Sequence, residues 1–91
     1  MADVVVTLRI MPKNVDSNLK LIETKATKKI AEFGGEVGRV SINEIAFGLK
    51  ALELIFVMKE SIGSTEELEN DIQKIKDVNS VEVTDVRRAI G

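Results

Sequence analysis

The feature that most constrains the fold of this chain is its hydrophobic period, which switches repeatedly between two residues and about 3.6 residues. Alternating apolar positions predict a first strand with one buried face, at Val4, Val6, Leu8 and Ile10. From Asp16 the period becomes helical, and the pair Gly34 and Gly35 ends the predicted helix. A period-2 strand followed by a single-striped helix is therefore the first unit of the fold.

The second half of the chain has the same order of elements. Two period-2 segments, around Val40–Ile42 and Leu52–Met58, are predicted strands joined by a turn at Phe47 and Gly48. A final strand is expected over residues 78–86. A second helix is predicted between the strand at Leu52–Met58 and this final strand.

The second helix is predicted from its ends and its apolar stripe. Ser64 and Glu67 have the spacing of a capping box at its start, and Lys74 and Lys76 are expected in its last turn. The stripe consists of Leu68, Ile72 and Ile75.

The order β-α-β-β-α-β predicts an α+β fold, the ferredoxin-like split βαβ sandwich. We expect a four-stranded antiparallel sheet with two helices on one face and with the first and third strands central. The other face would carry Val5, Ile55 and Val57. These residues are either scattered surface apolar residues or a small docking patch.

The composition of the chain argues against several classes of function. The 91 residues are enough for a single domain, 1–91, and contain neither histidine nor cysteine, so the commonest general base and the soft metal ligands are missing. We expect no enzyme activity, no cofactor and no metal site. A formal net charge of −2 argues against nucleic acid as a direct partner. The lack of cysteine, of a targeting segment and of a long apolar run favours a cytoplasmic protein without a membrane contact.

Two places in the chain are candidates for a partner-binding surface. The turn carries Ile45, Phe47 and Gly48, although turn residues are usually polar. Phe47 either folds back over the end of the core or is an exposed contact residue. The dibasic pair Arg87 and Arg88 near the C-terminus is either a solubilising pair on a frayed end or a second contact.

Three segments together resemble archaeal elongation factor 1-beta. These are the turn Ile45–Leu49, the opening Asp3–Val5 with Met11–Pro12, and the ending Val81–Arg88, which lie in matching order over nearly the whole chain. The resemblance implies a guanine-nucleotide exchange factor that promotes GDP release and GTP reloading on elongation factor 1-alpha during translation elongation.

The resemblance also implies roles for the candidate residues. In eukaryotic relatives an aromatic residue in a similar turn docks on the GTPase, which matches Phe47, and a lysine next to the C-terminus reaches toward the magnesium site. The lysine position falls on Arg88, and arginine is a planar fork rather than a point charge. The tail from Ala89 to Gly91 extends beyond it. From the alternating strand directions, we predict that Phe47 and Arg88 lie at opposite ends of the sheet.

Two other function classes use the same fold. A small-molecule-sensing regulatory module would be expected to dimerise through an open edge or sheet face, whereas an exchange domain of this kind is expected to be a monomer. An RNA-binding ferredoxin-like domain needs aromatic residues on its two central strands for base stacking. No aromatic residue is expected on the open face here.

Overall fold

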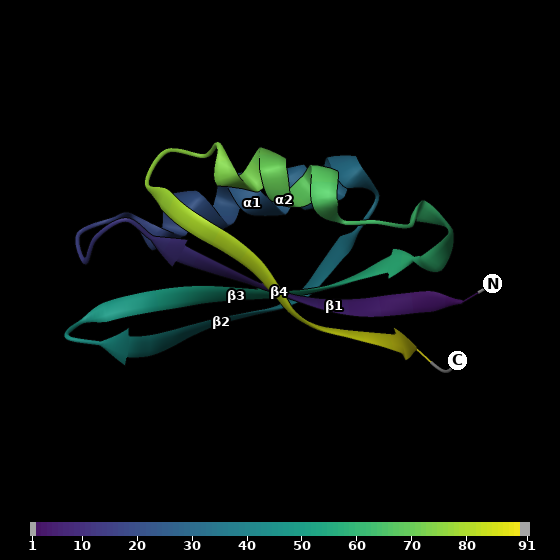
Figure 1. The fold of residues 1–91 in the computed structure, drawn as a ribbon, viewed down its shortest axis with the longest axis horizontal. Coiled ribbons are helices and arrows are strands. Elements are labelled where there is room, and N and C mark those ends of the chain that lie inside the picture. Colours follow the sequence, from purple (N-terminus) through teal and green to yellow (C-terminus); the bar gives the residue numbers. More distant parts are fainter. Residues whose placement is uncertain (1, 90–91) are drawn as a thin grey trace.

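The computed structural model describes residues 2–89 and confirms the predicted order of elements. In chain order they are β1 (Asp3–Pro12), α1 (Leu19–Phe33), β2 (Glu36–Ala46), β3 (Leu49–Lys59), the 3₁₀ turn η1 (Glu60–Ile62), α2 (Glu66–Gln73) and β4 (Val78–Ala89). The strands form one antiparallel sheet in the order β2-β3-β1-β4, and both helices cover the same face (Figure 1). The fold is therefore the ferredoxin-like split βαβ sandwich, with β1 and β3 in the centre.

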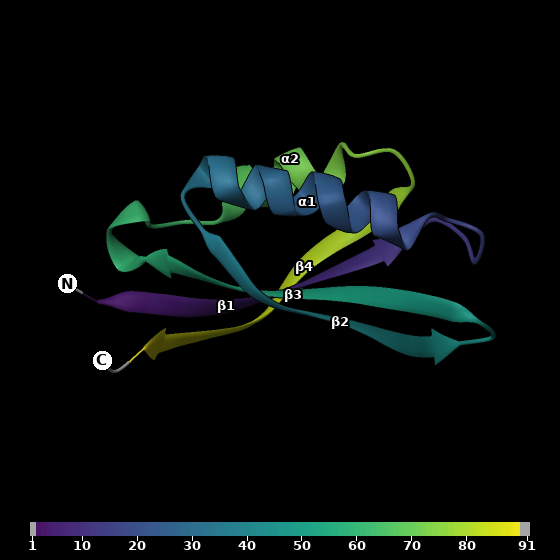
Figure 2. The same ribbon diagram turned by 180° about the vertical axis from the view of Figure 1, so that it is seen from behind.

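The core lies between the sheet and the helices. α1 packs on the β2 and β3 side, α2 packs on β4, and the two helices touch each other (Figure 2). Alternation along β1 and β3 turns the buried residues toward the helices, as predicted. The largest fully buried side chains include Phe56, Leu8, Ile10, Ile22, Ile30, Leu52, Leu54, Leu68 and Ile72.

Gly35 lets α1 and β3 approach each other closely. A Cβ atom at this position would lie 2.9 Å from both Ile30 Cγ2 and Phe56 Cδ2. Two buried side chains therefore occupy the space that any other residue would need.

The two ends of α1 follow local rules. The Asn18 Oδ1 atom accepts a hydrogen bond from the Leu21 N–H at 3.1 Å, so the helix begins at Leu19 rather than near Asp16. At the other end Gly34 adopts a φ of 109°, and its N–H donates to the carbonyls of Ile30 and Ala31. The predicted glycine stop is confirmed.

The predicted start and end of α2 are wrong in detail. The N-cap is Thr65, and its hydroxyl donates to the Glu69 carboxylate at 2.8 Å instead of capping a backbone N–H. Ser64 Oγ accepts from the Glu66 N–H, two residues away, so no capping box with Glu67 forms. The helix ends at Gln73, which leaves Lys74 as the C-cap and Lys76 outside the helix.

The sheet is longer than the helices that cover it. α1 has 15 residues and spans about 22 Å, whereas the molecule is 42 Å long. The β2–β3 hairpin projects beyond the helices at one end, and β4 runs to Ala89 at the other, past the predicted end at Val86 (Figure 1). Val40 and Ile42 share the helix-facing side with Leu54 and Leu52, yet Ile42 is 52% exposed because no helix covers it.

Candidate functional site

The β2–β3 turn consists of two residues with positive φ, 48° at Phe47 and 82° at Gly48. A two-residue hairpin turn of this kind matches the twist of the strands and favours asparagine followed by glycine. Glycine adopts this conformation without strain, but a phenylalanine in the left-handed region is destabilised by about 1–2 kcal/mol. Folding alone therefore does not explain Phe47.

Phe47 does not cover the core. Its exposed fraction is 101%, so the interpretation in which the ring folds back is wrong. Ile45, which lies at an irregularity in the pairing of β2 with β3, is also exposed. The hairpin tip thus presents two large apolar side chains to solvent, and Gly48 makes the turn that holds them there.

A hollow beside the turn was missed by the sequence analysis. It has a volume of about 340 Å³ and is formed by the loop between β1 and α1 together with Gly48 and Lys50. Val15 in that loop is 59% exposed. The available signal was an apolar residue between Asn14 and Asp16, in a loop whose other residues are mostly polar.

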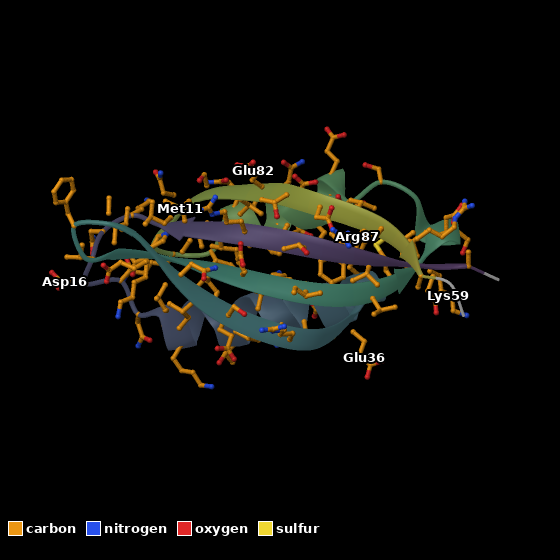
Figure 3. The ribbon with its side chains drawn as sticks, turned by 90° about the horizontal axis from the view of Figure 1, so that it is seen from below. Met11, Asp16, Glu36, Lys59, Glu82 and Arg87 are labelled. Atoms are coloured by element: carbon orange, nitrogen blue, oxygen red, sulfur yellow. The ribbon has the colours of Figure 1, made fainter. Side chains whose placement is uncertain are left out.

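Arg87 and Arg88 lie inside β4 rather than on a frayed end. Arg88 is paired with Val4 on the helix-facing side of β1, and Arg87 is paired with Val5 on the open side. The two arginines therefore project from opposite faces of the strand and do not act as one dibasic cluster. Figure 3 looks onto the open face, with Arg87 in front of the sheet and the helices behind it. Ile90 and Gly91 of the predicted tail lie outside the described residues.

Each arginine is paired with a carboxylate of the same chain. Arg88 donates from Nε to Glu60 Oε2 at 2.8 Å and from Nη2 to Glu60 Oε1 at 2.6 Å. Arg87 donates from Nε to Asp85 Oδ2 at 2.8 Å. The hydrogen bond that Arg88 donates to Glu60, followed by the negative charge of this carboxylate, raises the pKa of Arg88.

The Arg88 pair borders a second hollow. This hollow has a volume of about 320 Å³ and is lined mainly by apolar side chains, including Val4, Met58 and Val86, with Glu60 among its lining residues. Val86 is 58% exposed. An apolar surface and a charged pair therefore meet at this end of the sheet.

The two candidate contacts lie at opposite ends of the molecule, as predicted. Arg88 pairs with Val4, and Val4 in turn pairs with Met58 near the end of β3. The turn precedes Leu49 at the beginning of the same strand. Since each strand residue advances about 3.3 Å, the two ends are about 30 Å apart. The structure thus groups Ile45, Phe47 and Gly48 at one end and places the arginines at the other.

The open face of the sheet carries both apolar and charged groups. Val5 and Ile55 are partly buried, and Val57 is 39% exposed. Farther along β1, Arg9 lies opposite Glu53 of β3 and opposite Glu82 of β4 in the strand register. Charged residues therefore interrupt the apolar surface.

Within residues 2–89, no group of three acidic side chains lies close enough together to hold a metal ion. No helix in that part of the chain has the length and apolar content needed to cross a membrane.

Comparisons with known proteins identify relatives of the whole chain. The model of the EF-1 guanine nucleotide exchange domain matches residues 5–89. Elongation factor 1-beta of Methanothermobacter thermautotrophicus is 39% identical over 88 residues, which cover 97% of this chain and 98% of that protein. Elongation factor 1-beta of Staphylothermus marinus is 42% identical over 89 residues, with the same two coverages.

Solved structures with low sequence identity share the fold. The ACT domain from the GTP pyrophosphokinase of Chlorobium tepidum superposes with a TM-score of 0.62 at 21% identity, covering 89% of this chain and 97% of that one. The de novo designed protein Foldit4 also gives a TM-score of 0.62, at 18% identity and 98% coverage of both chains. These likenesses concern the architecture alone. Because the family model and the curated relatives extend over nearly the whole sequence, the chain belongs to the EF-1 guanine nucleotide exchange domain family.

Proposed function

We propose that this chain, as a single exchange domain over residues 1–91, promotes GDP release and GTP reloading on elongation factor 1-alpha through two separate contacts. Membership of the family assigns it a guanine nucleotide exchange role in translation elongation. The observation that supports the two contacts is the strained, fully exposed Phe47 about 30 Å from the oriented Arg88.

The physical basis of this activity is linkage rather than bond making. A GTPase holds its nucleotide by charge through a magnesium ion, so a cation brought toward that ion is repelled by it and raises the free energy of the nucleotide-bound complex. By reciprocity, GDP weakens binding of the exchange factor by the same factor. No covalent step is required of the chain, so we do not regard it as an enzyme in the usual sense.

The two ends would have different tasks. Arg88 would approach the nucleotide-binding domain, and the tip formed by Ile45, Phe47 and Gly48 would bind a neighbouring domain. Arginine offers a planar fork of donors where eukaryotic relatives have lysine. Its contact with phosphate or carboxylate oxygens would therefore be directional.

We expect the chain to act as a cytoplasmic monomer without direct nucleic-acid contact. Both edge strands of the sheet carry register irregularities, which discourage pairing with another chain. The chain has three phenylalanines and neither tryptophan nor tyrosine. Phe33 belongs to α1, Phe47 to the turn and Phe56 to the core, so none of them offers a stacking platform on the open face.

The direct test is release of a fluorescent GDP from purified elongation factor 1-alpha. Addition of the chain in catalytic amount, with excess unlabelled nucleotide, should accelerate the release, and the chain alone should hydrolyse no nucleotide. Absence of acceleration while the two proteins demonstrably bind would refute the exchange function.

A further inference from the structure

The end of the sheet that carries Arg88 is built so that a second residue can hold this side chain in place. η1 follows β3 directly, and the Glu60 N–H donates to the carbonyl of Ala2 at 3.1 Å. The turn is closed by a hydrogen bond from the Gly63 N–H to the Glu60 carbonyl at 3.1 Å. The backbone of Glu60 is thus fixed at both of its polar groups, next to the start of β1.

The Glu60 side chain reaches across β1 to β4. Val4 of β1 lies between Met58 of β3 and Arg88 of β4, and all three belong to the helix-facing side. Glu60 comes two residues after Met58, and its carboxylate accepts both hydrogen bonds from the Arg88 guanidinium. The contact joins residues 28 positions apart in the sequence.

The geometry of the pair leaves donors free. An arginine has five N–H donors, and the bond pair from Nε and Nη2 uses one on each of these two nitrogens. The two hydrogens on Nη1 and the second hydrogen on Nη2 remain. The side chain of Arg88 is 68% exposed, so these donors are accessible to a partner.

We propose that Glu60 is a positioning residue for Arg88: it holds one edge of the guanidinium and orients the other edge toward an anionic oxygen of the partner GTPase. This inference rests on the proposed exchange function. A lysine at position 88 could not be held in this way, because its ammonium group has no second, fixed edge. Glu60 therefore acts on the rate of exchange through Arg88 and does not itself touch the nucleotide.

A matched control exists on the same strand. Asp85 and Arg87 also form an exposed carboxylate–guanidinium pair, with a single bond and on the opposite face of β4. Glu60→Gln and Asp85→Asn each remove one negative charge, and each deprives one arginine of its charged partner. General effects of charge or strand order would affect both variants alike.

The experiment measures GDP release from elongation factor 1-alpha at saturating concentrations of the full chain. Glu60→Gln should lower the maximal rate about fivefold, the upper range for an exposed ion pair, with an unchanged half-saturating concentration. Asp85→Asn should stay within about twofold of the wild-type maximal rate. Thermal unfolding should show that both variants remain folded.

A double-mutant cycle separates positioning from a direct role. In an Arg88→Ala background, Glu60→Gln should cause no additional loss, since the residue through which it acts is absent. The inference is overturned if Glu60→Gln leaves the maximal rate unchanged, raises it, or lowers it equally in both backgrounds. If Arg88→Ala itself has no effect on exchange, the proposed role of Arg88 fails and this inference fails with it.

Discussion

Replacement of Phe47 by alanine tests whether the hairpin tip serves binding rather than folding. The ring is fully exposed, so its removal takes no apolar area out of the core. The free energy of unfolding should therefore change by less than about 0.5 kcal/mol. Replacement of an ordinary core phenylalanine by alanine would instead lower the free energy of unfolding by about 3–5 kcal/mol.

The expected effect on the partner follows from the area available. A buried phenylalanine removes about 150 Å² or more from water, which at about 25 cal/mol per Å² gives an upper value of about 4 kcal/mol. Alanine retains part of this contact, and truncation of an aromatic anchor residue to alanine typically weakens the binding free energy by about 1–3 kcal/mol. The concentration of chain needed for half-maximal GDP release should rise about 5- to 150-fold. The maximal rate should change little.

Two further variants sharpen this test. Phe47→Asn fits the positive φ of 48° better than phenylalanine does, so it should raise the free energy of unfolding by up to about 1 kcal/mol while weakening binding as alanine does. Leu21→Ala removes another large exposed side chain, at the outer surface of α1, and should leave the titration unchanged. Normal binding by folded Phe47→Ala, or a loss of several kcal/mol of stability, would refute the reasoning.

Three other predictions concern the opposite end and the packing. Arg88→Ala should lower the maximal exchange rate while leaving the half-saturating concentration within about twofold; a kinetic defect identical to that of Phe47→Ala would contradict the division of tasks. In urea unfolding, Gly35→Ala should lower the free energy of unfolding by about 1–3 kcal/mol, because its added methyl group overpacks against Ile30 and Phe56. Gly38→Ala, whose Cβ would meet nothing nearer than 3.9 Å, is the matched control and should be near neutral. Asn18→Ala removes the N-cap of α1 and should lower the free energy of unfolding by about 1 kcal/mol. Thr65→Ala should lower it by less, because the Thr65 side chain caps no backbone N–H. Equal losses for the two variants would contradict the cap assignment.

The fold was predictable because its strongest signals are periodic and non-overlapping. Alternation in β1 and β3 identified the buried faces, and Gly34 marked the end of α1 through the backbone conformation that glycine favours. The start of α2 was mispredicted because Ser64 has two possible acceptor roles, an N-cap or a short local bond to Glu66. Spacing alone does not distinguish them.

The candidate site was only partly predictable, for a different reason. The sequence shows that an aromatic residue occupies a turn, but its exposure depends on how far the hairpin extends beyond the helices. The separation of Arg87 from Arg88 follows from strand alternation only once β4 is known to continue to Ala89. Glu60 had no distinguishing signal, because its partner lies 28 residues away and on a strand that is not adjacent to β3.

The overhanging sheet gives a structural reason for the positions of the two proposed contacts. α1 covers about half of the 42 Å length, so each end of the sheet lacks a helical layer. The helix-facing side chains there, such as Ile42 at one end and Val86 at the other, are more than half exposed and contribute little to the stability of the isolated chain. A longer helical layer would bury them, but it would also cover the surfaces beside Phe47 and Arg88. The arrangement thus leaves part of the sheet outside the core and keeps two separated surfaces on one sheet, which suits the proposed contact with two parts of a partner at a fixed distance.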